Sequence, residues 1–424
     1  MKIWSHAFGC RVNQYEAESL RERLASAAAA RETADYKEAD LCLVNTCSVT
    51  GEADREALKL LRLITRNNPG ARLVVTGCLA TRDPGSVRRS APHAEIVDNS
   101  RKDDIPALIG CRVTPERGGI AAFRGHSRAF VKIQDGCDMN CSYCIIPAVR
   151  PGLKSRPVAE LVAEINRLVA GGFSEIVLCG IRLGRYLSTD GGKRVDFIGL
   201  LERVISLEGR FRIRLSSIEI TDVTDRLIAL MAGSDGRICP SLHVPLQSGS
   251  DRVLKLMRRW YSADFYRHRI LALKRAIPHP GLFTDVMAGF PGESAEDFEK
   301  TARLIEEIEF SGLHVFRYSP RPGTDAASLR GQTPEEAAAE RGRRLRALDG
   351  RLRAAFAEQW AGKIRTGVAL DGGREALTDE FLTVRMADGP LLPGLRPIRV
   401  LPTPAGAGET ESIKEAFFYA ENMS

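Results

Sequence analysis

Three closely spaced cysteines, Cys137, Cys141 and Cys144, are the densest group of reactive side chains in the sequence. They occupy a loop that is predicted to follow a strand at residues 129–133. Thiolates are soft ligands that select iron–sulfur clusters or zinc. A structural zinc site needs a fourth cysteine or histidine close by, but the next cysteine is Cys179. The spacing therefore favours a 4Fe–4S cluster with one iron left open to bind another molecule.

A second set of cysteines is widely separated in the sequence but regular in its placement. Cys10, Cys47 and Cys78 each come just after an apolar segment that is predicted to be a strand. The carboxyl ends of parallel strands line one edge of an open sheet, so we expect these thiols to converge. The alternative is that they are small buried hydrophobic residues, as free cysteines often are. That alternative suits Cys42, inside its strand, better than the three cysteines in turns.

Composition indicates a soluble globular protein with more than one domain. A chain of 424 residues exceeds one ordinary core, so two or three domains are expected. No apolar run approaches the roughly 20 residues that span a membrane, and the first residues lack a signal-peptide pattern. We therefore expect a cytoplasmic protein with no membrane partner. In that reducing compartment, ten cysteines indicate metal ligation or catalysis rather than disulfides. The net charge of +7 permits an RNA partner without requiring one.

Alternating strand and helix patterns divide the chain into four predicted parts. Residues 1–112 are predicted to form an open parallel α/β domain. After a linker, residues 126–330 contain six strand–helix repeats, which predict a partial β/α barrel. Residues 333–361 form an arginine-rich helix that is expected to begin with a capping box at residues 333–336. Residues 362–424 have short strands and Gly/Pro turns, typical of a small β-barrel.

The three-cysteine loop, with Tyr143 before its last cysteine, resembles the signature of the radical S-adenosylmethionine superfamily. This resemblance implies that Cys137, Cys141 and Cys144 hold a 4Fe–4S cluster whose open iron chelates the methionine end of S-adenosylmethionine. Reductive cleavage of that molecule would give a 5′-deoxyadenosyl radical, while the protein supplies orientation and excludes side reactions.

Later segments resemble the parts of that superfamily that hold the cofactor. Each lies at the end of a predicted strand, where barrel active sites are found. The residues implied as cofactor contacts are Tyr143, Gly180, Glu219, Gln247, Ser248, Asp285 and Gly289. Taken singly, these residues are weak evidence for a cofactor site. Glu219 could equally be a surface carboxylate, and His243, in the same segment as Gln247, could be a hydrogen-bonded core histidine.

The order of the motifs resembles a narrower family, the methylthiotransferases. Cys10, Cys47 and Cys78, each in its short motif, precede the three-cysteine loop as they do in that family. The resemblance covers nearly the whole chain and implies that these three cysteines hold a second 4Fe–4S cluster, which carries the sulfur to be inserted. It also implies that the C-terminal module is a TRAM domain that binds tRNA. The arginines of the preceding helix are either a solvated face or a further tRNA contact.

Among three branches of that family, the residues around Cys10 and Cys47 most resemble the branch that acts on N6-threonylcarbamoyladenosine in tRNA. The branches that act on isopentenyl-adenosine in tRNA and on an aspartate of a ribosomal protein remain alternatives. Substrate contacts are implied for Arg11, Asn13 and Asn45, with Arg11 at a position where the first branch commonly has lysine. The segment Arg150–Arg156 and the residue Arg182 also differ from the residues that the family usually has at these positions.

The implied reaction replaces the C2–H of that base, beside the anticodon, with C2–S–CH3. One S-adenosylmethionine would supply the methyl group and another the radical, which is needed because an unactivated aromatic C–H has no acidic proton. The implied partners are the anticodon loop of tRNA, an electron donor and a sulfur donor, and DNA is not expected. Two other classes remain as alternatives, a radical methylase that transfers no sulfur and a non-enzymatic iron–sulfur protein that binds RNA.

Overall fold

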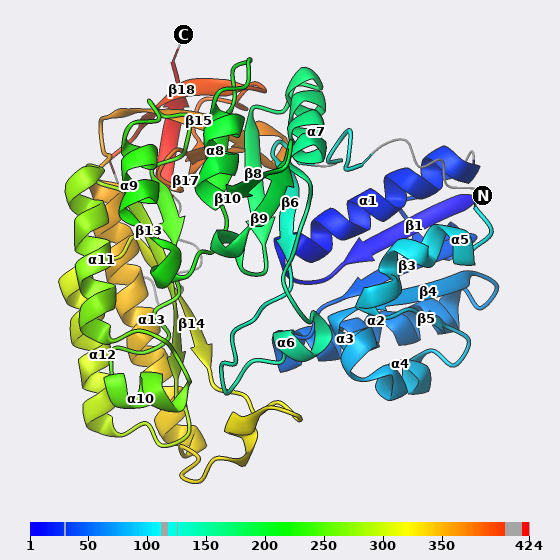
Figure 1. The fold of residues 1–424 in the computed structure, drawn as a ribbon, viewed down its shortest axis with the longest axis horizontal. Helices are drawn as coiled ribbons and strands as arrows, with labels where there is room; N and C mark the ends of the chain where they lie inside the picture. The colour runs from blue at the N-terminus through cyan, green and yellow to red at the C-terminus, as the bar shows by residue number, and fades with distance from the viewer. Residues whose placement is uncertain (29–30, 112–117, 125, 403–417, 424) are drawn as a thin grey trace.

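The N-terminal part of the chain is an open parallel sheet (Figure 1). The computed structural model describes residues 1–28, 31–111, 118–124, 126–402 and 418–423. The first sheet has five parallel strands, in the order β2 (Arg31–Glu32), β1 (Lys2–Ala7), β3 (Leu41–Thr46), β4 (Arg72–Gly77) and β5 (Glu95–Ile96). This is the open parallel α/β arrangement that the alternating pattern predicts.

Helices cover both faces of this sheet because successive side chains of a strand point to opposite sides. Leu41 and Leu43 of the fully buried strand β3 pack with α1 (Arg11–Ala28) and α5 (Ile105–Leu108). Cys42 and Val44 pack on the other side with α2 (Gly51–Asn67), α3 (Cys78–Arg82) and α4 (Pro84–Ser90). A run that is apolar at every position is what a central parallel strand needs.

The middle of the chain forms a partial β/α barrel, as the strand–helix repeats predict. Its parallel strands make two hydrogen-bonded groups. The first is β11 (Arg212–Leu215), β8 (Glu175–Gly180) and β6 (Ala129–Asp135), with β7 (Lys154–Ser155) antiparallel at the edge. The second is β12 (Ser241–His243), β13 (Gly281–Ala288) and β14 (Gly312–Arg317).

Helices pack around the outside of these strands in one continuous core. They are α7 (Val158–Ala170), α8 (Phe197–Ile205), α9 (Asp225–Ala232), α11 (Ala263–Ala276) and α12 (Ala295–Ile308). Shorter elements complete this part: α6 (Ile146–Val149), α10 (Asp251–Leu256) and the hairpin β9 (Leu187–Asp190)–β10 (Lys193–Asp196). The same core includes Val12 and Tyr15 of α1, so the N-terminal sheet and the barrel share one packed interface.

Among the described residues, six short 3-10 helices connect the main elements. They are η1 (Tyr36–Glu38), η2 (Asn99–Asp104), η3 (Leu183–Arg185), η4 (Ile220–Asp222), η5 (Asp325–Ser328) and η6 (Asp371–Gly373). Of these, η2 matters for the site because it follows β5 at the carboxyl edge of the N-terminal sheet.

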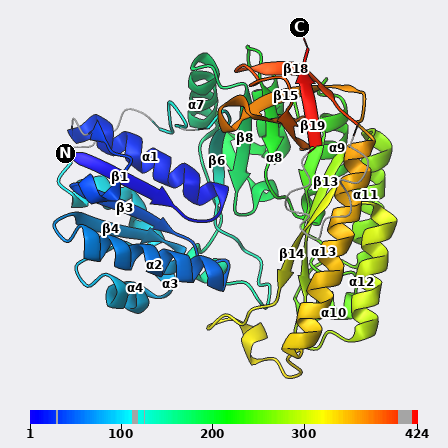
Figure 2. The ribbon, with the colours of Figure 1, turned by 180° about the vertical axis from the view of Figure 1, so that it is seen from behind.

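The long helix α13 (Glu335–Glu358) lies along β14 (Figure 2). The expected capping box is absent, because Pro334 occupies the cap position and the Thr333 hydroxyl donates to the Phe290 carbonyl at 3.0 Å instead. Two of its arginines pair with carboxylates of α12, Arg344 with Glu299 at 2.7 Å and Arg351 with Glu306 at 3.4 Å. Those arginines are therefore part of a helix–helix contact.

The C-terminal part is a closed five-stranded barrel, as the short strands predict. Its strands follow the order β15 (Ile364–Leu370), β16 (Glu375–Thr378), β17 (Thr383–Met386), β19 (Phe418–Asn422) and β18 (Leu395–Val400). It is fixed to the central barrel through the buried Arg212 and Arg214 of β11. Both arginines pair with Glu175 and also donate to backbone carbonyls of the C-terminal barrel. In the part of the chain that the structure describes, no helix is long and apolar enough to cross a membrane.

Candidate active site

The three-cysteine loop follows β6 directly and is held by hydrogen bonds to its sulfur atoms. The Met139 amide donates to Cys137 Sγ at 3.4 Å, and Arg259 Nη1 donates to Cys141 Sγ at 3.4 Å. Burial, together with the thiols of Cys141 and Cys137, raises the pKa of Cys144 to about 12. The structure thus brings the three thiols together. Metal binding displaces thiol protons, and N–H donors stabilise the thiolates that result.

The loop depends on a glycine immediately before its first cysteine. Gly136 has φ +76°, and a Cβ on it would lie 1.6 Å from the carbonyl oxygen of Gly152. Only glycine lets the segment around Gly152 lie this close. On the other side Arg182 Nη1 donates to Asp138 Oδ1 at 2.6 Å, so this unusual arginine braces the cysteine loop.

Cys10, Cys47 and Cys78 converge at the carboxyl edge of the N-terminal sheet. Cys10 stands immediately before α1, Cys47 follows β3, and Cys78 begins α3. Burial, together with the thiols of Cys10 and Cys78, raises the pKa of Cys47 to about 11. Gly9 has φ +80°, and a Cβ on it would lie 2.3 Å from Cys47 Sγ, so the chain before Cys10 passes directly over that sulfur. Asn99 Nδ2 lies 3.7 Å from Cys78 Sγ.

The spacing of the thiols suits clusters better than single metal ions. Thiolates around one zinc ion, at about 2.3 Å from it, are roughly 3.8 Å apart. In neither triad do all three Sγ atoms lie within 4.8 Å of one another, whereas cysteines that bind different irons of one cluster are farther apart. Both donor sets, three thiols with N–H groups nearby, fit a 4Fe–4S cluster.

A cavity of about 610 Å³ lies where the three parts of the molecule meet. Cys10 and Arg11 enter its wall from the N-terminal sheet. Gly180 and Asp285, two of the implied cofactor contacts, enter it from the ends of β8 and β13. Phe381 enters from the C-terminal barrel. The cavity therefore extends from Cys10 to the ends of the barrel strands, which is where active sites of β/α barrels lie.

A hydrogen-bonded chain of side chains forms one wall of this cavity. His243 Nε2 lies 2.9 Å from Asp285 Oδ1, and His314 Nδ1 lies 3.3 Å from the same oxygen. His243 Nδ1 lies 2.5 Å from Ser217 Oγ. Burial opposes ionisation of Asp285, but the two histidines hold its pKa well below the usual range. His243 is thus satisfied at both ring nitrogens and still lines the cavity, an arrangement that sequence reasoning did not find.

The other implied cofactor contacts lie near the cysteine loop or in the packing of the strand ends. Glu219 is not a free surface carboxylate, since it pairs with Arg259, the arginine that donates to Cys141. Tyr143 packs edge-on against Phe290 with ring centroids 6.3 Å apart. Gln247, Ser248 and Gly289 do not line the cavity. Gln247 pairs by backbone with β13, the Ser248 hydroxyl lies 3.3 Å from that of Thr301, and the Gly289 amide donates to Glu293.

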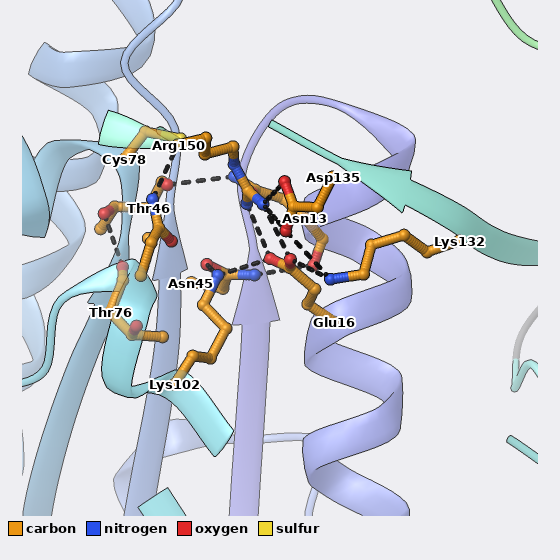
Figure 3. A network of polar contacts seen from close by, with 12 residues as sticks. Asn13, Glu16, Asn45, Thr46, Thr76, Cys78, Lys102, Lys132, Asp135 and Arg150 are labelled. Carbon is orange, nitrogen blue, oxygen red and sulfur yellow. Dashed lines mark hydrogen bonds and ion pairs between the residues drawn. The ribbon is translucent and has the colours of Figure 1, made fainter. Parts of the chain in front are cut away.

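A buried ionic network joins the N-terminal sheet to the cysteine loop (Figure 3). Arg150 donates to both oxygens of Asp135 at 2.8 Å and to both oxygens of Glu16 at 2.8–2.9 Å. Glu16 also pairs with Lys102 and Lys132. Burial alone would disfavour the Glu16 carboxylate, but these three cations hold its pKa well below the usual range. The network therefore fixes α1 against the start of the three-cysteine loop.

Asn13 and Asn45, implied as substrate contacts, belong to this network instead. Both are fully buried, and neither lines the cavity. Asn13 donates to the Phe8 and Thr46 carbonyls and accepts from Arg150 at 2.8 Å. Asn45 donates to the Asn13 carbonyl and accepts from Lys102. Because their amide groups are occupied within the protein, they hold the sheet edge in place. Arg11 is the implied substrate contact that does line the cavity.

Comparison with known families and proteins agrees with this architecture. Residues 131–305 match the Radical SAM superfamily, and residues 2–98 match the family described as Uncharacterized protein family UPF0004. The chain is 38% identical over 379 residues to threonylcarbamoyladenosine tRNA methylthiotransferase MtaB of Bacillus subtilis, covering 85% of this chain and 82% of that protein. It is 36% identical to the tRNA-2-methylthio-N(6)-dimethylallyladenosine synthase of Thermobifida fusca, covering 81% and 73%.

Solved structures with a similar fold are more distant in sequence. The radical S-adenosylmethionine methyltransferase TsrM of Kitasatospora setae superposes with a TM-score of 0.55 at 13% identity, covering 77% of this chain and 76% of that one. At this identity the likeness shows the fold alone. Together with the extended similarity to MtaB of Bacillus subtilis, it places the chain in the methylthiotransferase family of the radical S-adenosylmethionine superfamily.

Proposed function

We propose that this protein replaces the C2–H of N6-threonylcarbamoyladenosine, next to the anticodon of tRNA, with a methylthio group. The observation that carries the proposal is the closeness of two cysteine triads on different parts of the chain. Cys78 of the first triad lies in one small hydrophobic cluster with Ile145, the residue that directly follows Cys144 of the second. A reaction that joins radical formation to sulfur transfer needs both functions beside one substrate.

Each triad is assigned one cofactor by the chemistry of its donors. When bound at Cys137, Cys141 and Cys144, a 4Fe–4S cluster supplies the electron that cleaves S-adenosylmethionine, and a second cluster at the other triad supplies sulfur. The chain's own residues would hold the two clusters and donate N–H groups to the cysteine sulfur atoms. Arg150 fixes the position of one triad relative to the other. Radical formation requires an outside electron donor, and sulfur transfer requires an outside sulfur source. A tRNA substrate makes the cytoplasm the expected location.

The relatives named as threonylcarbamoyladenosine enzymes support the choice of base, and so does the partly charged cavity wall. The cavity also has apolar parts, including Val12, Phe283 and Phe316. These parts would suit the dimethylallyl group named in other relatives, which is the second candidate substrate. Phe381 in the cavity wall supports a role of the C-terminal barrel in presenting RNA to the site.

The test uses reconstituted enzyme under anaerobic reducing conditions, with nucleosides analysed by mass spectrometry. We expect Cys141→Ala to abolish 5′-deoxyadenosine formation. Cys47→Ala should retain that product but form no methylthio nucleoside. Cys111→Ala, at a cysteine outside both triads, is the matched control and should form both 5′-deoxyadenosine and the methylthio nucleoside. Methylthiolation of isopentenyl-adenosine RNA in preference to threonylcarbamoyladenosine RNA would reject the proposed substrate.

A further inference from the structure

Most charged groups in the cavity wall are already paired within the protein. Arg214 donates from Nε and Nη2 to Glu175 at 2.9 Å and from Nη1 to Ser241 at 2.6 Å. Asp285 accepts hydrogen bonds from two histidines, as described above. These groups therefore have little capacity left to balance a charge that a ligand would bring.

Arg11 is different, because its guanidinium has no hydrogen bond or ion pair with any residue that the structure describes. Its nearest described ring is that of Phe130, whose centroid lies 6.0 Å from the guanidinium carbon. The side chain is partly buried and lines the cavity. A guanidinium that is withdrawn from water without a partner is costly, and a planar anion is the ligand that best offsets the cost.

The backbone at the same place adds positive charge. The helix α1 has 18 residues, begins at Arg11, and has no acidic residue in its first turn. Cys10, Arg11 and Val12 all line the cavity, so the amino end of the helix faces it. The aligned peptide dipoles place roughly half a positive elementary charge at such an end. Side chain and backbone thus favour an anion at one point of the wall.

The position of Arg11 beside Cys10 limits which anion can bind there. Arg11 directly follows Cys10 in the sequence. In adenine, C2 and C6 both flank N1, so the N6 substituent lies on the same edge of the base as the C2 atom that reacts at the Cys10 triad. Under the proposed function that substituent ends in a threonine carboxylate, whereas the dimethylallyl group of the alternative substrate has no charge.

We propose that Arg11 binds the carboxylate of the threonylcarbamoyl group and so selects an anionic N6 substituent over a neutral one. This inference rests on the proposed function and adds to it the residue that recognises the N6 substituent of the substrate. The other anion that RNA offers is a backbone phosphate, which every anticodon loop carries whatever its base. A substrate that changes only the carboxylate separates these two sources.

The test compares two synthetic anticodon stem–loop RNAs, one with N6-threonylcarbamoyladenosine and one with its carboxylate converted to the neutral methylamide. Wild-type enzyme should prefer the carboxylate RNA in kcat/KM by about 10- to 100-fold, equivalent to about 1.4–2.8 kcal/mol. Arg11→Gln should lose that preference by weakening use of the carboxylate RNA alone. Arg11→Lys keeps the charge without the planar fork and should retain part of the preference.

Controls separate recognition from damage to the neighbouring triad. The iron content and the RNA dissociation constants of Arg11→Gln are measured beside its kinetics, and its iron content should equal that of wild type. Arg62→Gln, which removes an exposed arginine of α2 far along that helix, should leave both RNAs unaffected.

Two results would overturn the inference while leaving the proposed function intact. An equal loss on both RNAs in Arg11→Gln would assign the arginine to a phosphate, and an unchanged preference would give it no role. If wild-type enzyme methylthiolates neither RNA, the proposed function itself fails, and the two failures are therefore distinct.

Discussion

Replacing Arg150 with methionine should loosen the junction between the N-terminal sheet and the three-cysteine loop. The Arg150 side chain is 2% exposed and donates to Asp135, Glu16 and Asn13. Methionine has a similar reach but no donor, so it leaves Asn13 Oδ1 unsatisfied and removes one cation from each carboxylate. Breaking a buried ion pair from one side costs about 3–5 kcal/mol, and we expect a loss of stability in that range.

The effect should be measured by urea denaturation of the full-length protein, with hydrogen exchange to locate the loss. Exchange should increase in α1 and β6, which the network joins. Arg101→Met is the matched control, because Arg101 pairs with Asp104 while about half exposed and should cost less than about 1 kcal/mol. A loss for Arg150→Met no larger than this control would refute the reasoning that the network fixes the junction.

The same network predicts the direction of a pH effect. The pKa of Glu16 is held well below its usual range, although burial opposes this. A carboxylate with a lowered pKa contributes stability that is fully present above its unfolded pKa of roughly 4.3 and is lost as pH falls through the folded pKa. In Arg150→Met the folded pKa of Glu16 should rise, so acid unfolding should begin at a higher pH than in wild type. An unchanged acid midpoint would contradict this.

Three further predictions concern the cluster loop and the C-terminal barrel. Arg259→Leu removes an N–H donor from Cys141 and should lower the reduction potential of the bound cluster, measured by redox titration followed by EPR; an unchanged potential argues against the hydrogen bond. Gly136→Ala should abolish iron binding at the loop in iron and sulfide assays, whereas Gly152→Ala, equally strained at φ +73° but in open space, should keep it. Arg212→Met should cost about 3–5 kcal/mol at the barrel contact and release the C-terminal barrel to limited proteolysis; resistance equal to wild type would show that packing alone holds it.

Strand periodicity predicts the parts of the fold that carry the cysteines, because local patterns determine them. The apolar run Leu41–Thr46 indicates a central strand, and Cys47 follows from where that strand ends. Two strands of the C-terminal barrel, β16 and β19, are hard to predict from the sequence, since four or five residues carry little periodicity. The hairpin Leu187–Asp196 is hard to predict for the same reason.

The polar groups around the cysteines could not be predicted, because their partners are distant in sequence. Arg150 and Glu16 are 134 positions apart, and no local pattern connects them. Asn13 and Asn45 look the same in sequence whether they face a ligand or a neighbouring carbonyl, and the sequence does not predict that both donate to backbone carbonyls. Arg259 lies in an irregular segment, and only the structure shows that it reaches Cys141.

The two triads differ in how much of the chain must be folded before each exists, and this has a consequence for maturation. Cys137, Cys141 and Cys144 come from one loop, so they are neighbours as soon as that loop forms, although the hydrogen bonds from Arg182 and Arg259 are added only when the barrel folds. Cys10, Cys47 and Cys78 meet only after β1, β3 and β4 have paired. If both triads hold clusters, as proposed, we therefore expect iron to be delivered in a fixed order, first to the loop and last to the sheet edge. Under the proposed function, a misfolded N-terminal sheet would then yield protein that holds iron only at the three-cysteine loop, and that cleaves S-adenosylmethionine without forming the methylthio product.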